Sequence, residues 1–433
     1  MFKFPAYAQL EVTDKCNLRC RHCYHFDTKQ MPVSKDLSDE DTTTLINSLV
    51  AAGIYSLVIT GGEPLVRPQL TLKAVDIAKS AGMSVSVNSN LLLLNSQLAE
   101  KFKDSKVNSF LVSCPASDSE MYQRVTRCGN YDRFKSKLEI LLNTNISCMV
   151  NMVVTKLNCH LVRDTATEMA RLGVKRFAAT PASLNVEHPD FESLLDKSQT
   201  IIMLEDLKWC DEYLGLSVDS LEPLPKCFYP EWCWQKKYAF MERSCQAGRM
   251  SISVSNTGDV RPCSHNPMVY GNMFSERLDT IWEKMSPCRN KTTPDSCTQC
   301  PSVLMCNGSC RTNALAIAGE ITKPDRFFVG HMASPEILYT NKIIKNDSLI
   351  VFNGKIYFRK EMGENHSIAT KRGGRNLMIV NEELFNFINW LEGKLPLTFT
   401  DLKKCCQVDD SNKSFMSIMS TLLRREFIKI SNQ

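Results

Sequence analysis

Three cysteines near the start of the chain constrain its fold most. Cys16, Cys20 and Cys23 form a C-x3-C-x2-C array within Glu11–Phe26, directly after a short apolar segment. Three closely spaced thiolates suit three irons of a [4Fe–4S] cube and leave the fourth iron free for another ligand. A zinc ion would normally need a fourth protein ligand to complete a tetrahedron. The array therefore predicts an iron–sulfur cluster with one open iron, and an inert or zinc-binding cysteine group is the alternative.

Length and composition narrow the class of protein further. A chain of 433 residues should hold two or three domains. A formal net charge of +5 without a block of Lys and Arg does not indicate a nucleic-acid partner. The start of the chain lacks the apolar core of a signal peptide, and no apolar run approaches the roughly 18 residues of a membrane span. We therefore expect a cytoplasmic protein, in which 19 cysteines indicate metal ligands rather than disulfides.

The first half of the chain, to about Gly215, alternates strand and helix patterns. The predicted strands are Ala6–Val12, Tyr55–Thr60, Met83–Val87, Ser109–Ser113, Ile146–Thr155 and Val174–Thr180. The clearest helical patterns between them are Asp39–Ala52, Gln69–Ala81, Asp132–Leu142, His160–Leu172 and Ser198–Leu214. Six such units in sequence predict an α/β fold with a parallel sheet and right-handed crossovers.

The cysteine array and these units together resemble the radical S-adenosylmethionine (SAM) enzymes. The resemblance implies a partial (β/α)6 TIM barrel, in which the amino and carboxylate groups of SAM fill the open iron of the cube. His22 stands where the family usually has another aromatic residue, and it is a candidate cofactor contact. Catalytic groups should then gather at the C-terminal ends of the strands.

The motif Gly61-Gly62-Glu63-Pro64 follows the second predicted strand and precedes a helix. By the resemblance, it contacts the amino group of SAM. Its two glycines let the backbone approach a ligand closely, and Glu63 supplies an anionic acceptor. A plain turn is the alternative.

Further candidate SAM contacts lie at or near the ends of later strands. They are Asn90, Ser113 and Asn151, with Arg124 as a possible partner of the SAM carboxylate. Two of them depart from the family pattern, because Leu91 replaces the usual Gly and the acid expected after Ser113 is missing. A structural role is the alternative for each.

The region from Glu222 to about Gly330 is rich in Cys, Pro and aromatic residues. The segment Ser251–Pro262 predicts a hairpin, with its turn at Asn256–Gly258, that returns Cys263 toward Cys245. The downstream spacing is C-x2-C-x5-C-x3-C. It is formed by Cys297, Cys300, Cys306 and Cys310. This pattern resembles the SPASM domain, which carries auxiliary iron–sulfur clusters, and a zinc ribbon on the last four thiols is the alternative.

By the family's assignment, the first auxiliary cluster is held by Cys245, Cys263 and Cys310, and the second by Cys297, Cys300 and Cys306. Each set lacks one thiolate, and the family's last cysteine falls where this chain has Phe327-Phe328. Asp325 or a distant thiol could complete the second set. Cys233 or Cys227 could complete the first, or its open iron could meet substrate, and Cys288 is spare.

Ser264 and His265 follow Cys263, at the place where sulfatase-maturing relatives carry an aspartate base. They are candidate catalytic residues here. The missing acid counts against a sulfatase maturase.

The last hundred residues predict a third unit. Asn353-Gly354 between two β-type runs, Leu349–Phe352 and Lys355–Phe358, predicts a hairpin. The further elements predicted are a strand at Leu377–Val380, helices at Glu382–Glu392, Thr400–Cys405 and Ser414–Arg425, and a strand at Phe427–Ile430. The order resembles the PqqD-like winged-helix module, which captures leader peptides. The alternative is a winged helix that binds DNA or stabilises the core.

The sequence thus predicts a radical SAM barrel over residues 1–221, a SPASM domain over 222–332 and a PqqD-like module over 333–433. By resemblance, SAM is cleaved to a 5′-deoxyadenosyl radical that installs a carbon–carbon or carbon–heteroatom crosslink in a ribosomally made precursor peptide. The implied partners are SAM, a core [4Fe–4S] cluster, one or two auxiliary [4Fe–4S] clusters, and an electron donor such as flavodoxin or ferredoxin. The alternatives are an anaerobic sulfatase maturase that makes formylglycine, and a non-catalytic iron–sulfur protein that binds peptide.

Overall fold

The computed structural model describes residues 3–23, 36–187, 189–236, 238–290, 292–330, 344–354, 356–361, 367–371 and 377–431. The predicted positions Tyr24–Phe26, Ala333 and Lys355 lie outside these ranges. The chain divides into two compact units. The first comprises Phe4–Ala81 and Val85–Pro335, and the second comprises Glu336–Gln433 with Met1–Lys3 and Gly82–Ser84.

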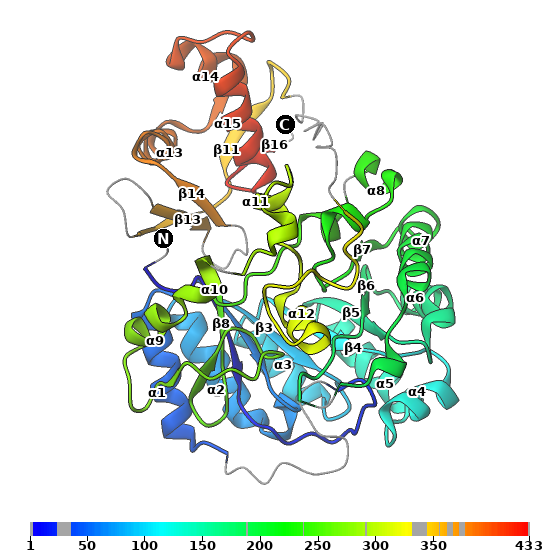
Figure 1. Ribbon diagram of the computed structural model, residues 1–433. Helices are drawn as coiled ribbons and strands as arrows, with labels where there is room; N and C mark the ends of the chain where they lie inside the picture. Colours follow the sequence, from blue (N-terminus) through cyan, green and yellow to red (C-terminus); the bar gives the residue numbers. More distant parts are fainter. Residues whose placement is uncertain are drawn as a thin grey trace. The chain divides into compact units, whose positions relative to one another are not determined.

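The first unit is built on a ten-stranded sheet with the order β10-β9-β8-β1-β2-β3-β4-β5-β6-β7 (Figure 1). Its first seven strands are β1 (Tyr7–Glu11), β2 (Ser56–Thr60), β3 (Ser84–Ser89), β4 (Ser109–Ser113), β5 (Ser147–Val154), β6 (Arg176–Pro181) and β7 (Ser217–Asp219). They follow one another in chain order, with parallel pairing between β1 and β2 and from β3 to β7. The predicted parallel α/β sheet is confirmed, and β7 adds a short strand that the sequence did not reveal.

Helices connect these strands. They are α1 (Asp39–Ala51), α2 (Pro68–Ser80), α3 (Ser96–Asp104), α4 (Ser119–Thr126), α5 (Tyr131–Asn143), α6 (Val162–Arg171) and α7 (Lys197–Leu214). The clearest start signal is a capping box at α1, where Ser38 and Asp41 satisfy each other's backbone N–H groups. At the other end of the series, α7 stops at Gly215, which adopts the left-handed conformation that glycine tolerates.

The cysteine-rich region continues the same sheet. The predicted hairpin is confirmed as β8 (Ser251–Val254) and β9 (Asp259–Arg261), with β10 (Gly271–Asn272) beside it. Because β8 pairs in parallel with β1, the hairpin extends the barrel sheet. The helices of this region are short. They are η4 (Lys226–Phe228), α8 (Glu231–Lys236), α9 (Leu278–Lys284), α10 (Ser286–Asn290), α11 (Val303–Cys306) and α12 (Arg311–Ala318).

The second unit contains two three-stranded sheets. One has the order β15-β11-β16 and the other β12-β13-β14. Their strands are β11 (Leu349–Phe352), β12 (Ile356–Lys360), β13 (Ser367–Lys371), β14 (Leu377–Val380), β15 (Leu397–Thr398) and β16 (Ile428–Ser431). Three helices, α13 (Glu382–Lys394), α14 (Phe399–Cys406) and α15 (Lys413–Arg424), accompany them around a shared apolar core.

The hairpin predicted at Asn353-Gly354 is wrong. The strands on its two sides, β11 and β12, belong to different sheets, and β11 pairs instead with β15 and β16. Asn353 also donates its backbone N–H to the Phe427 carbonyl and its Nδ2 to the Glu426 carbonyl. These contacts with residues 426 and 427 take the place of a local turn.

The helices of the described ranges are all too short or too polar to span a membrane.

Candidate active site

A cavity of about 370 Å³ lies in the first unit, at the ends of the parallel strands. Many of the residues predicted from sequence line it. They are Cys16, Cys20, His22, Cys23, Gly61, Gly62, Glu63, Asn90, Ser113, Asn151, Ser264 and His265. They come from the loop after β1, from the ends of β2 to β5, and from the loop after β9. The parallel sheet therefore collects at one edge residues that lie far apart in the sequence.

The three predicted cluster thiols face this cavity on one loop. The backbone N–H of Leu18 points at the Cys16 sulfur, 3.4 Å away, and Cys23 donates its backbone N–H to the Cys20 carbonyl. Burial raises the pKa of Cys16 to about 12, and it raises the pKa of Cys20 as well. In the cluster-free protein Cys16 and Cys20 are therefore protonated, and they must lose their protons when iron binds.

Among the described residues, no three His, Cys, Asp or Glu side chains converge tightly enough to hold a single metal ion. The four irons of a cube are separate atoms, so its thiolates bind at different corners and need not converge on one point.

The two glycines of the Gly61–Pro64 motif have a structural task that the sequence did not reveal. Gly62 and Glu63 donate their backbone N–H groups to the carbonyls of Thr13 and Lys15, at 2.8 Å each. A Cβ on Gly61 would lie 2.2 Å from the Thr13 oxygen, and one on Gly62 would lie 2.3 Å from the Lys15 oxygen. The close approach that requires glycine is therefore made to the strand end just before the cysteine loop.

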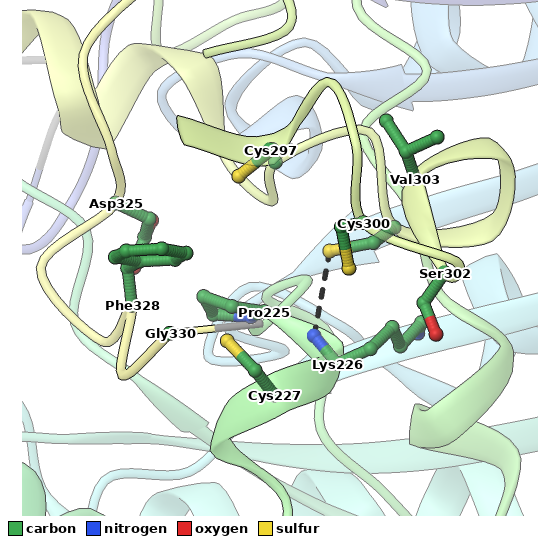
Figure 2. Close-up of a pocket in the computed structure, with 12 residues that line it drawn as sticks. Pro225, Lys226, Cys227, Cys297, Cys300, Ser302, Val303, Asp325, Phe328 and Gly330 are labelled. Atoms are coloured by element: carbon green, nitrogen blue, oxygen red, sulfur yellow. Dashed lines mark hydrogen bonds between the residues drawn. The ribbon is translucent and has the colours of Figure 1, made fainter. Parts of the chain in front are cut away.

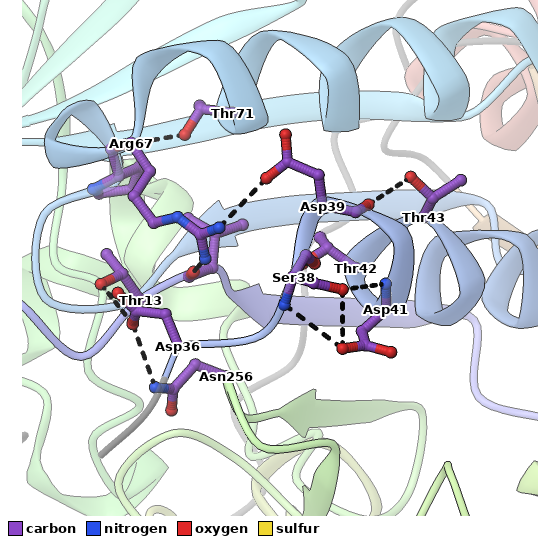
Figure 3. A network of polar contacts seen from close by, with 12 residues as sticks. Thr13, Asp36, Ser38, Asp39, Asp41, Thr42, Thr43, Arg67, Thr71 and Asn256 are labelled. Carbon is purple, nitrogen blue, oxygen red and sulfur yellow. Dashed lines mark hydrogen bonds and ion pairs between the residues drawn. The ribbon is translucent and has the colours of Figure 1, made fainter.

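A polar network holds the same strand end from the other side (Figure 3). Thr13 donates its hydroxyl to Asp36, 2.9 Å away, and Lys15 forms an ion pair with Asp36 at 2.9 Å. Arg67 donates to the Val12 carbonyl at 3.2 Å and to Asp39 at 3.2 Å. The segment that leads into the cysteine loop is thus fixed by both backbone and side-chain contacts.

Glu63 is fully enclosed and accepts three hydrogen bonds. They come from the Leu65 N–H at 2.9 Å, the Ser89 hydroxyl at 2.8 Å and the Asn90 N–H at 2.7 Å. Burial nevertheless raises the pKa of Glu63 to about 7, because these donors offset only part of the cost of desolvating the charge. A carboxylate has about four acceptor sites, so a cationic ligand can still bind it.

Asn90 connects the end of β3 with the cysteine loop. Its Nδ2 donates to Asn17 Oδ1 at 2.9 Å and lies 3.9 Å from the Cys16 sulfur. Asn151 accepts a hydrogen bond from Thr180 at 2.7 Å, and Ser113 is its register partner on β4. Asn17 was not predicted, although its place beside Cys16 in the motif could have singled it out.

Two predicted contacts are not among the residues that line the cavity. Arg124 is exposed on α4, where its carbonyl accepts from Arg21 at 3.0 Å. Pro64 is buried at the start of the short helix η1 (Pro64–Val66), where it shapes the backbone of the motif.

The auxiliary thiols form two separate groups. In the first, Cys245, Cys263 and Cys310 act on one another electrostatically, and Cys263 lies 3.6 Å from the Thr312 hydroxyl. Cys245 lies close enough to Cys288 to raise the pKa of Cys288, and the Cys288 sulfur contacts the Tyr270 hydroxyl at 3.2 Å. In the second group, Cys297, Cys300 and Cys306 line one small pocket with Cys227 and Asp325 (Figure 2). The two groups have the same members as the interleaved assignment made from the sequence, and that assignment of cluster ligands stays a prediction.

Comparison with known proteins agrees with this geometry. Residues 10–158 match the model of the radical SAM superfamily, and residues 245–301 match that of the SPASM iron–sulfur cluster-binding domain. The chain thus contains a radical SAM domain and a SPASM domain.

Three relatives are similar to a larger part of this chain than the two domain models match. The chain is 25% identical to the AdoMet-dependent heme synthase of Methanosarcina barkeri over 76% of this chain and 97% of the relative. It is 26% identical to the subtilosin biosynthesis protein AlbA of Bacillus subtilis, over 65% of this chain and 60% of AlbA. In structure it resembles Streptococcus suis SuiB bound to its precursor peptide SuiA, with a TM-score of 0.57 and 18% identity over 77% of this chain and 76% of SuiB. The last likeness shows the shared fold.

A radical SAM domain binds SAM and a [4Fe–4S] cluster, and a SPASM domain binds auxiliary clusters. The residues of this chain fit such ligands. Two acceptor atoms of the cavity wall, Gln9 Oε1 and His22 Nδ1, are buried without a hydrogen-bond partner among the described residues. Burial also lowers the pKa of His22 to about 4, so the imidazole is neutral and its free nitrogen can face a polar ligand.

Glu222 is the main wall residue that the sequence did not reveal. Its carboxylate accepts from Ser183 and Asn313 at 2.9 Å each, and it also hydrogen-bonds the side chain of Cys310. It therefore connects the central cavity with the first group of auxiliary thiols. The signal was weak because Glu222 follows β7, a strand of only three residues.

The matched ranges end at residue 301, so the resemblance of the last hundred residues to a PqqD-like module remains a prediction. Within the second unit, a cavity of about 590 Å³ is lined by one end of β14 and by two helices. Its residues are Ile379, Asn381, Glu383, Leu384, Phe387 and Ile418.

Proposed function

We propose that the enzyme modifies a ribosomally made precursor peptide and installs a carbon–carbon or carbon–heteroatom crosslink. The observation that carries this proposal is the shared wall of the central cavity. The core thiols and the Glu63 motif form one part of it, and Ser264 and His265, next to the auxiliary ligand Cys263, form another. A peptide segment bound in the cavity would therefore meet both cluster systems.

When bound, the core cluster and SAM supply a 5′-deoxyadenosyl radical that removes a hydrogen atom from the substrate. The residues of the chain serve to bind and orient. Glu63 holds the ammonium group of SAM, while Asn90, Ser113 and Asn151 offer polar contacts to the remainder of the cofactor. A reduced protein such as flavodoxin or ferredoxin provides the electron.

The cavity of the second unit, which we call the groove, fits the leader of such a peptide. β14 is an edge strand of its sheet, so an extended segment can add to it by backbone hydrogen bonds. Beside that edge, the exposed Ile379 and the partly buried Leu384 and Phe387 offer apolar anchors. In this proposal residues 333–433 capture the leader and raise the local concentration of the core peptide.

Anaerobic co-expression with each small peptide encoded next to the gene tests the proposal. Mass spectrometry should show one peptide losing hydrogen in multiples of two, with fragments that locate a crosslink. In the variant Ile379→Glu, turnover of that peptide should fall about tenfold, because a charge replaces an apolar anchor. Ser414→Glu, which adds the same charge at an exposed position on α15 outside the groove, should leave turnover unchanged. Unmodified peptides in every co-expression would refute the proposal.

Chemistry of the heme synthase kind is a second candidate, because that relative aligns along 97% of its own length. The two candidates differ in what the second unit does. For a peptide substrate, Ile379→Glu slows turnover, whereas a heme precursor has no leader for the groove to hold. Conversion of an iron porphyrin by the purified enzyme, at a rate insensitive to Ile379→Glu, would favour the second candidate.

A further inference from the structure

The second group of auxiliary thiols holds more ligands than its sequence motif supplies. Cys297, Cys300 and Cys306 come from one stretch of chain, and three thiolates leave one iron of a cube without a protein ligand. The pocket that they line also contains Cys227, which lies on η4 before the motif begins. In Figure 2 the sulfurs of Cys227, Cys297 and Cys300 point into the same space.

We propose that Cys227 is the fourth ligand of this auxiliary cluster, so that Cys227, Cys297, Cys300 and Cys306 enclose it with no open iron. The proposal goes beyond the assignment of the substrate and does not depend on it. It also differs from the sequence-based expectation, which considered Cys227 for the first auxiliary cluster.

Several contacts fix the segment that carries Cys227 against the cysteine motif. Lys226 donates its backbone N–H to the Cys306 sulfur at 3.3 Å, and Ser309 donates its hydroxyl to the Pro223 carbonyl at 2.5 Å. The ring of Phe228 packs on that of Phe327, with centroids 4.8 Å apart. Contacts on both sides of Cys227 thus hold its thiol at the pocket.

The mutual effects of charge among the thiols also indicate that Cys227 lies near the other three. Ionised Cys300 and Cys306 both act on Cys227, and ionised Cys227 acts in turn on Cys297. The N–H of Lys226 already points at the Cys306 sulfur, and such donors stabilise a thiolate once it binds iron. The open space between the thiols is small, about 20 Å³, and rotation about the Cα–Cβ bonds can widen it.

Asp325 is the competing ligand in the pocket, but its carboxylate already has partners. It accepts a hydrogen bond from the Phe327 N–H at 2.9 Å, it lies beside the Ser309 side chain, and the cationic Arg311 and Arg326 act on it electrostatically. Recruiting it to iron would disturb this network. Cys233 and Cys288 are not among the residues that line the pocket. Cys227 therefore has the advantage of both place and softness, because a thiolate suits iron–sulfur chemistry better than a carboxylate.

The test is cysteine alkylation, read by mass spectrometry on the full-length protein before and after anaerobic reconstitution. Cys227 should be labelled in the cluster-free protein and become protected together with Cys297 when iron and sulfide are added. The exposed Cys405 should be labelled in both states and serves as the internal standard. Labelling of Cys227 at an unchanged rate while Cys297 is protected would overturn the proposal.

Variants separate ligation from simple shielding. In Cys227→Ala, labelling of Cys297 after reconstitution should approach its rate in the cluster-free protein, and bound iron and sulfide should fall. Cys210→Ala, which changes a buried cysteine on α7 outside both thiol groups, should match the wild type. Uncoupled SAM cleavage by Cys227→Ala would show that the variant is folded.

Asp325→Asn completes the set and should leave the labelling of Cys297 unchanged. If Asp325→Asn exposed Cys297 and Cys227→Ala did not, Asp325 would be the ligand and the proposal would be wrong. Retention of wild-type iron, sulfide and protection by Cys227→Ala would also contradict it. So would zinc without sulfide bound at these four thiols.

Discussion

The core thiols and the second auxiliary group use cysteine in opposite ways. Cys16, Cys20 and Cys23 lie on one loop that faces a cavity of about 370 Å³, and Glu63 and Asn90 line the same cavity. The second group gathers thiols from two distant segments around a pocket of about 20 Å³. The two sites thus differ both in the number of thiols and in the space beside them. By our proposals, three thiols beside a large cavity would leave an iron for SAM, whereas four around a small pocket would leave no iron open.

Removing the core thiols should have the largest effect, because it abolishes one of the two cluster sites and spares the other. The triple variant Cys16→Ala, Cys20→Ala, Cys23→Ala should lose all SAM cleavage. Only one other described thiol, that of Cys114 just after β4, lines the central cavity. The variant should keep the iron of the auxiliary groups. Iron analysis and the yield of 5′-deoxyadenosine measure the two effects. Loss of every iron would show that the auxiliary sites do not bind clusters independently.

Gly62→Ala should weaken the core site without touching the auxiliary ones. The added Cβ would lie 2.3 Å from the Lys15 carbonyl, so the backbone before the cysteine loop must move. Overpacking of this kind typically costs about 1–3 kcal/mol. We expect the core cluster to be lost faster under a chelator, while the auxiliary iron is retained. Gly393→Ala, where a Cβ meets nothing within 4 Å, is the matched control and should behave as the wild type.

The variant Glu63→Ala tests whether Glu63 binds SAM at the core site. A carboxylate that faces an ammonium group makes a charge-assisted hydrogen bond worth roughly 1.5–3 kcal/mol. Its loss should raise the dissociation constant of SAM about tenfold to a hundredfold, measured by calorimetric titration of the reconstituted protein. The exposed Glu40 on α1 provides the control Glu40→Ala. An unchanged affinity would remove Glu63 from the SAM site.

The pH dependence of SAM binding is the smallest effect. Since the pKa of Glu63 is raised to about 7, half of the SAM-free protein carries a neutral carboxyl group at that pH. SAM affinity should therefore rise with pH, by about twofold from pH 7 to pH 8, and fall more steeply below pH 7. Binding should also release a proton, which calorimetry in two buffers detects. A dependence that persists in Glu63→Ala would assign it to another group.

The sequence predicted most of the core site because its parts are local or follow a regular repeat. The cysteine spacing lies within a few residues, and alternation of strand and helix brings Glu63, Asn90 and Asn151 to one edge of the sheet. The contact of Gly62 with Lys15 could not be predicted, because it depends on how two neighbouring strands end. Glu222 was missed because β7 is too short to show a period.

Long-range strand pairing explains the wrong hairpin in the second unit. Asn353-Gly354 favours a turn by its residue types, but the pairing of β11 with β16 outweighs this local preference. Cys227 lies far in sequence from Cys306, so spacing alone could not assign it to a group. Helix α4 was missed because its sequence, SEMYQRVT, has few apolar positions.

Transfer of a labelled hydrogen shows whether the radical takes its hydrogen atom from the bound peptide. The precursor peptide would be prepared with deuterated side chains and incubated anaerobically with the reconstituted enzyme, SAM and a reductant. Because the account has the 5′-deoxyadenosyl radical take hydrogen from the bound peptide, mass spectrometry should find deuterium in the 5′-deoxyadenosine formed. The Ile379→Glu variant should give less of the labelled product. If the peptide were modified while the 5′-deoxyadenosine carried no deuterium, the account would be contradicted.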